Sequence, residues 1–73
     1  MRGTWIKYTP SDSTVEIFNI DNATRFRHVD TPHEAFVEVH ADDAVHTITR
    51  MVDPEAYQIV LRYIQQTTGF EVG

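Results

Sequence analysis

The chain of 73 residues contains no cysteine, so neither a disulfide nor a thiolate metal site can support its fold. A domain below about 70–80 residues builds only a marginal hydrophobic core and commonly needs such support. Self-association is the other common remedy, so we expect a homo-oligomer, a dimer in the simplest case, or binding to another protein. The absence of cysteine also suits a reducing compartment, and we expect a cytoplasmic protein.

Glycine is scarce as well, with one residue near the N-terminus and the others at positions 69 and 73. No glycine-rich loop is present that could hold a phosphate, which excludes a P-loop and a dinucleotide-binding fingerprint. The sequence also lacks the Gly-x-Ser-x-Gly elbow of a serine nucleophile. Because so short a chain has little volume for a deep pocket, we expect no catalytic site and no cofactor.

The sequence also lacks long hydrophobic runs and has few lysines. No segment approaches the roughly 20 apolar residues of a membrane span, and residues 1–4 lack the apolar stretch of a secretory signal, so we expect no membrane association. Lys7 is the only lysine, and eleven acidic residues against six basic ones give a net charge of −5. An acidic surface repels phosphate backbones, which disfavours binding to nucleic acid.

The last third of the chain carries a complete helix pattern. Asp53 is a suitable N-cap, Pro54 suits the first helical position, and Glu55 suits the positive end of the helix dipole. Gly69 is a suitable C-terminal stop. Between them, apolar residues recur at a spacing that places them on one face: Tyr57, Val60, Leu61 and Ile64. The pattern predicts a helix over about residues 54–68.

The residues before the helix favour short strands. Residues 35–40 and 44–51 flank Asp42-Asp43, a plausible two-residue hairpin loop. That loop would place Val37 opposite Ile48 and Val39 opposite His46, so the apolar residues Val37, Val39 and Ile48 would share one face. Further strands are predicted near residues 4–8, 14–20 and 23–29. In the second of these the alternation slips between Ile17 and Phe18, which indicates a bulge or cover on both faces.

These elements predict a single α+β domain over residues 1–73. A small antiparallel sheet of four to five strands, within residues 4–51, would pack against the one C-terminal helix. The expected core takes one face of each strand and of the helix: Ile6, Val15, Ile17, Phe26, Val37, Val39, Ile48, Tyr57, Val60, Leu61 and Ile64.

The segment Phe18-Asn19-Ile20-Asp21-Asn22-Ala23-Thr24-Arg25-Phe26 resembles one found in small uncharacterised prokaryotic β-sheet domains. In those domains a strand, an Asn-apolar-Asp-Asn step and a second strand lead to a hairpin and a C-terminal helix. The resemblance covers nine residues. It implies the same succession of elements here, and it implies no activity.

Four histidines are dense for this length and are the candidate metal ligands: His28, His33, His40 and His46. A zinc or iron site needs three or four ligands that converge on one point. Neither the helical i, i+4 pair nor the His-x-His strand pair is present. The predicted hairpin also places His40 and His46 on opposite faces. We therefore interpret these residues as surface and sheet-face histidines, with a metal-binding protein as an alternative.

Arg25-Phe26-Arg27-His28 is the only basic run. Strand alternation would place Arg25 and Arg27 on one face and Phe26 and His28 on the other. An RNA-binding sheet needs basic and aromatic groups on one surface. The predicted alternation separates these groups, so a nucleic-acid-binding regulator that uses Arg25 and Arg27 is only a second alternative. An arginine pair at a protein interface fits the same residues.

Ile59 and Tyr63 form a second apolar ridge on the predicted helix, because they are four residues apart and lie off the main stripe. One helix over one small sheet cannot bury two ridges, so both are interface candidates. Phe36, on the second face of the hairpin, and Phe70, beyond the helix, are also candidates. These features predict a non-catalytic, self-associating protein-interaction module or an accessory subunit.

Overall fold

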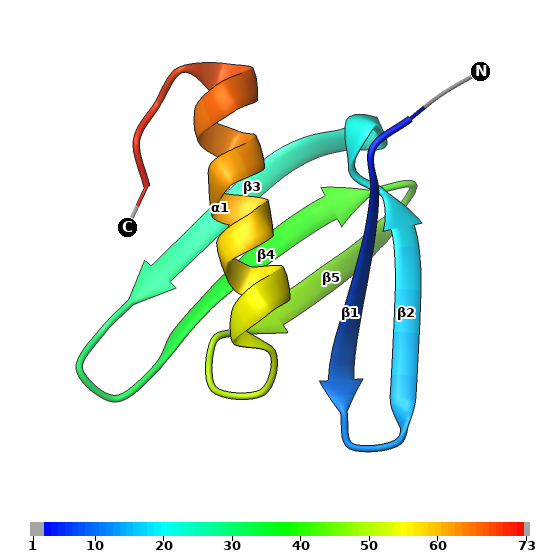
Figure 1. The fold of residues 1–73 in the computed structure, drawn as a ribbon. Coiled ribbons are helices and arrows are strands. Elements are labelled where there is room, and N and C mark those ends of the chain that lie inside the picture. Colours follow the sequence, from blue (N-terminus) through cyan, green and yellow to red (C-terminus); the bar gives the residue numbers. More distant parts are fainter. Residues whose placement is uncertain (1–2, 73) are drawn as a thin grey trace.

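The computed structural model describes residues 3–72 as five strands followed by one long helix (Figure 1). The elements are, in order, β1 (Trp5–Ser11), β2 (Thr14–Asn19), the short 3₁₀ helix η1 (Ile20–Asn22), β3 (Ala23–Asp30), β4 (Ala35–Ala41), β5 (Ala44–Thr49) and α1 (Pro54–Thr68). All strand pairs are antiparallel. The predicted α+β class is confirmed, but the strands form two sheets, one of β1 and β2 and one in the order β3-β4-β5.

Helix α1 has the bounds that its capping residues predict. The Asp53 side chain accepts a hydrogen bond from the Ala56 N–H at 3.1 Å, and Gly69 ends the helix in the left-handed conformation at φ 82°. The second carboxylate oxygen of Asp53 accepts from the Thr9 N–H at 2.9 Å. The residue that starts the helix therefore also fastens its first turn to β1.

The β4–β5 hairpin turns on Asp42 and Asp43, whose φ angles are 53° and 61°. Two consecutive residues with positive φ make a type I′ turn, whose twist matches that of the flanking strands. The turn sets the predicted register, with Val37 opposite Ile48 and Val39 opposite His46. Aspartate tolerates this conformation better than most residues do, which explains how the hairpin forms without glycine.

The core lies between the three-stranded sheet and the elements on one of its faces. Along β4, every second residue from Ala35 to Ala41 is buried, and the residues between them are half-buried. Helix α1 packs against β1, β4 and β5, and lies across the sheet in Figure 1. We call the face of this sheet opposite to α1 the open face (Figure 1).

Side chains join the β1–β2 hairpin to the three-stranded sheet. Ile6 lies opposite Phe18 in the hairpin, and both point into the core with Tyr8. The Phe18 ring stacks on the His46 ring of β5 with 4.0 Å between ring centroids. Tyr8 meets both rings edge-on. This aromatic cluster fills the space between β1 and β5, which do not pair through their backbones.

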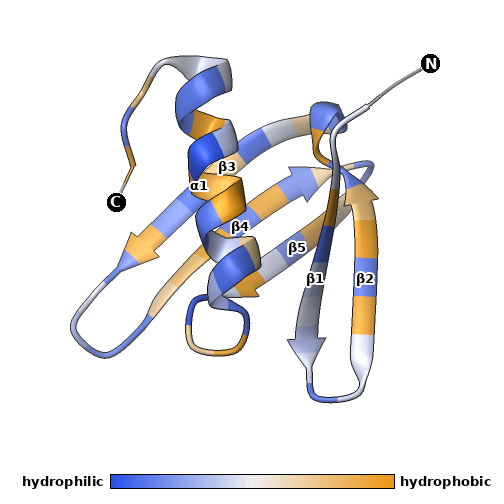
Figure 2. Ribbon diagram, in the orientation of Figure 1, coloured by the Kyte–Doolittle hydropathy of each residue, from blue (hydrophilic) through white to orange (hydrophobic). Residues whose placement is uncertain are grey.

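The predicted core is confirmed for eight of its eleven residues, which are Ile6, Val37, Val39, Ile48, Tyr57, Val60, Leu61 and Ile64, whereas Phe26 is only half-buried. For Val15 and Ile17 it was wrong, because they are 54% and 61% exposed while Phe18 and Ile20 are buried. The reason is the register that pairs Ile6 with Phe18 and so turns the odd-numbered residues of β2 outward. Apart from one hydrophilic band, most of β2 is hydrophobic in Figure 2, so its hydropathy alone does not distinguish the two faces.

Among the described residues, no helix has both the length and the apolar character that crossing a membrane requires.

Candidate protein-interaction site

The outer face of the β1–β2 hairpin exposes large apolar side chains to solvent. Trp5 and Lys7 of β1 and Val15 and Ile17 of β2 lie on this side, opposite to Ile6, Tyr8 and Phe18. Trp5 is 63% exposed, and Val15 and Ile17 are more than half exposed. We call these four residues the hairpin face. Contiguous exposed apolar residues on a small domain are typical of an interaction site.

Strand β1 also has a free edge. The Thr4 carbonyl accepts from the Ile20 N–H at 2.9 Å, so in this antiparallel ladder Ile6 and Tyr8 share the hydrogen bonds with β2. The backbone groups of Trp5, Lys7 and Thr9 consequently point away from β2. The bond from the Thr9 N–H to Asp53 agrees with this direction. Within residues 3–72, the backbone groups of Trp5 and Lys7 have no backbone partner.

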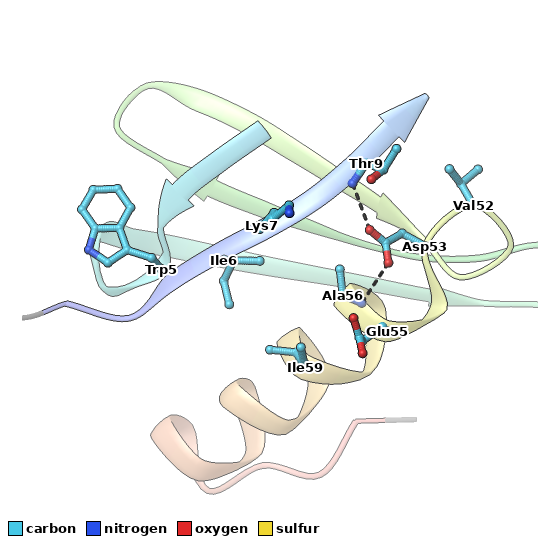
Figure 3. Close-up of a pocket in the computed structure, with 9 residues that line it drawn as sticks. All are labelled: Trp5, Ile6, Lys7, Thr9, Val52, Asp53, Glu55, Ala56 and Ile59. Carbon is cyan, nitrogen blue, oxygen red and sulfur yellow. Dashed lines mark hydrogen bonds between the residues drawn. The ribbon is translucent and has the colours of Figure 1, made fainter. Parts of the chain in front are cut away.

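The free edge of β1 borders a groove of about 530 Å³ that runs between this strand and the first half of α1. Figure 3 shows Ile6 extending from β1 toward the helix, and Glu55 and Ile59 extending from α1 toward β1. The exposed side chains of Trp5 and Val52 lie at opposite ends of the groove. The lining therefore combines apolar contacts with unpaired backbone groups, which is the chemistry that binds a peptide strand.

Three of the predicted interface residues lie on the open face. Arg25 and Arg27 of β3 point to this side, as their alternation predicts, and Phe36 of β4 lies beside them. The Arg27 guanidinium lies 3.6 Å from the Glu38 carboxylate across the strands. This ion pair, in which Arg27 is exposed and Glu38 is half-buried, and the half-buried Phe36 give the open face a mixed character, less apolar than the hairpin face.

The other interface candidates have separate environments. Ile59 is 42% exposed and lines the groove, whereas Phe70 is 74% exposed beyond the helix. Tyr63 is engaged inside the chain, because its hydroxyl donates to the Asp21 carboxylate at 2.7 Å and its ring lies against Phe26. This bond and the Thr4 N–H lower the pKa of Asp21, while burial raises the pKa of Tyr63.

The histidines lie apart and serve different contacts. His28 Nε2 is 2.7 Å from the Tyr57 hydroxyl, and His46 Nδ1 is 3.1 Å from the Tyr8 hydroxyl. His40 Nε2 lies on the open face, 3.7 Å from Glu38, and His33 is exposed between β3 and β4. Over residues 3–72, no three His, Cys, Asp or Glu side chains come close enough to hold a metal ion. The geometry therefore gives the metal-binding alternative no support.

Tyr8 gives the hairpin a measurable dependence on pH. Burial, the Glu16 charge and the hydrogen bond to Glu16 raise the pKa of Tyr8 to about 12. A tyrosine that ionises less readily when folded stabilises the fold fully below its ordinary pKa of about 10, and this contribution is lost as the pH rises toward 12.

We expect the free energy of unfolding, measured with urea at intervals from pH 9 to 12, to fall with rising pH. The fall should be shallower in Tyr8→Phe, which has no hydroxyl to ionise at this position. Tyr57 and Tyr63, whose pKa values are also raised by burial, act in the same direction in both proteins. Equal slopes for wild type and Tyr8→Phe would contradict the expectation.

Sequence reasoning overlooked Trp5 and Val52 as site residues. The signal for Trp5 was present, because Ile6 and Tyr8 are the inward pair of β1 and so place Trp5 and Lys7 outward. For Val52 no local signal exists, since its place beside the groove depends on how the loop before α1 meets β1.

Comparisons of this chain with protein-family models, with curated proteins and with solved structures find no match. The resemblance of residues 18–26 to small prokaryotic domains stays a prediction.

Proposed function

We propose that the protein is a non-catalytic protein-interaction module that forms a homodimer through its hairpin face. The observation that carries this proposal is the gathering of Trp5, Val15 and Ile17 on one exposed side of the hairpin. Contact with a second protein would bury these three large apolar side chains. The free energy of association becomes more favourable by about 25 cal/mol for each Å² of apolar surface that is buried.

A second copy of the same face is the partner that suits this surface best. A two-fold dimer brings the same patch together from both subunits, and homodimer interfaces are more apolar than other protein surfaces. The hairpin face meets that description, since Lys7 is its only charged side chain. The open face is less suitable, because Arg25, Arg27 and Glu38 would lose water there.

Sedimentation equilibrium over micromolar to millimolar concentrations tests the proposal. We expect wild type to approach twice the chain mass of 8.4 kDa. In Ile17→Lys we expect the dissociation constant of the dimer to rise about tenfold or more, because a charge replaces buried apolar area. Ile17 is exposed in the single chain, so this variant should fold normally.

Val45→Lys is the matched control, because Val45 is an exposed aliphatic residue of a strand at 55%, but lies on the open face. We expect its dimer to dissociate as wild type does. A wild type that stays monomeric at millimolar concentration would refute self-association. Equal weakening by Ile17→Lys and Val45→Lys would refute the assignment to the hairpin face.

A further inference from the structure

We propose that the groove between β1 and α1 binds an extended segment of another protein, which adds to the free edge of β1 as a new strand. The segment has apolar side chains at alternate positions and a basic side chain that lies beside Glu55. This inference deepens the interaction-module function proposed above, and it uses a surface that shares only Trp5 and Lys7 with the hairpin face.

The backbone of β1 supplies the first half of the recognition. Trp5 and Lys7 each direct one N–H and one C=O away from β2, and these groups have no backbone partner within residues 3–72. They are two residues apart, which is the spacing at which hydrogen bonds repeat along one edge of an antiparallel strand. An added strand would pair with both residues, as in other peptide sites built on a sheet edge.

Helix α1 supplies the apolar contacts, which are the second half of the recognition. Ile59 is partly exposed on the wall opposite to β1, and Ile6 and Ala56 lie between the two walls. Successive side chains of a strand point to opposite faces. One set from the added strand would therefore enter the groove against Ile59, and the other set would lie outside, beside Trp5. This alternation is the reason for the apolar preference at every second position.

The charges indicate a basic segment. Among the described residues that line the groove, Asp53 and Glu55 are the carboxylates and Lys7 is the cation. Both Asp53 oxygens already accept backbone hydrogen bonds, so Glu55 is the group that is free to meet a partner. The whole chain has a net charge of −5, which attracts basic partners and speeds their association.

Two occupants from this chain fit less well. The segment Phe70-Glu71-Val72 carries an acidic residue at its centre, and Val72 already packs against the core of its own chain. A second copy of β1 would bring its own α1 along, because α1 packs beside β1 in the chain. A groove with a strand edge on one side and a helix on the other is filled by a single strand.

A displayed library of random nonapeptides, selected on immobilised protein, tests the inference. We expect selected peptides to alternate apolar residues with others and to be enriched in Lys or Arg. Lys7→Pro should weaken their binding about tenfold or more, because it removes the N–H that points into the groove. This N–H is not used in the β1–β2 ladder, so the hairpin should persist. Lys7→Ala should bind nearly as wild type does.

Ile17→Pro is the matched control. Ile17 lies directly opposite Lys7, and its N–H points to the outer edge of β2, away from the groove between β1 and α1. Its peptide binding should equal that of wild type, whereas Glu55→Lys should reduce the binding of basic peptides. The absence of any selected peptide, or equal binding to wild type and Lys7→Pro, would overturn the inference.

The inference and the dimer can fail separately. Binding measured on Ile17→Lys, whose dimer is expected to be weaker, should match that of wild type. A protein that is monomeric at all concentrations and still binds the peptides would refute the dimer and support the groove. A protein that forms the dimer but binds no peptide would support the dimer and refute the groove.

Discussion

We expect Tyr57→Ala to leave most of the protein unfolded at room temperature. Tyr57 is 2% exposed and is among the largest fully buried side chains, at the point where α1 meets the three-stranded sheet. Replacing a buried aromatic residue by alanine costs about 3–5 kcal/mol. A domain this small has a core that supplies little more than about 3–5 kcal/mol in total. Far-ultraviolet circular dichroism and urea unfolding measure the result.

Tyr57→Phe is the control that separates ring volume from hydrogen bonding. It keeps the buried ring and removes only the hydroxyl, which lies 2.7 Å from His28 Nε2. We expect a loss of about 0.5–1.5 kcal/mol, the usual net value of one hydrogen bond. If Tyr57→Phe were as damaging as Tyr57→Ala, the His28 contact rather than packing would hold the helix to the sheet. A Tyr57→Ala protein as stable as wild type would contradict both.

The helix and the second hairpin could be predicted because their determinants are local. Asp53 and Gly69 fix the ends of α1 through contacts within a few residues, and the apolar spacing between them fixes its buried face. The Asp42-Asp43 turn fixes the β4–β5 register in the same way. In such segments the pattern and the fold agree, since no distant residue is needed to choose between alternatives.

Strand β2 could not be assigned in this way because its two faces are similarly apolar. Val15 and Ile17 compete with Phe18 and Ile20 for the core, and the periodicity supports either set. The choice is made by distant partners. Thr4 binds the backbone of Ile20, and His46 offers a flat ring on which Phe18 stacks. Neither contact is visible in the residues around position 17.

The candidate site depends on similar long-range contacts. Asp53, 44 residues away from Thr9 in the chain, accepts a hydrogen bond from the Thr9 N–H, and both residues line the groove. Ile59 was predicted as an interface residue from its position off the helix stripe, and it lines this groove. Tyr63 belonged to the same ridge, but its partner Asp21 lies in η1, and sequence spacing does not reveal that pairing.

We expect Phe18→Ala to destabilise the protein by about 3–5 kcal/mol, the cost of removing a buried aromatic ring. Phe18 is 6% exposed, and its ring contacts the rings of both Tyr8 and His46. Without this ring the β1–β2 hairpin loses its stacking contact with His46 of β5, a strand to which it has no backbone hydrogen bonds. Urea unfolding, followed by Trp5 fluorescence and by circular dichroism, should show a lower midpoint with both probes.

Ile17→Ala, one residue earlier, should change the free energy of unfolding by less than about 0.5 kcal/mol, because exposed positions tolerate substitution. Both proteins are measured at a concentration low enough to keep them monomeric, so that any dimer contact of Ile17 does not contribute. If Ile17→Ala proved the more damaging change, β2 would pack with its odd-numbered residues inward, and the hairpin face and the groove would both be wrong. The neighbouring pair therefore tests the register on which both proposed surfaces depend, since the same alternation turns Trp5 and Ile17 outward and directs the free backbone groups of Lys7 into the groove.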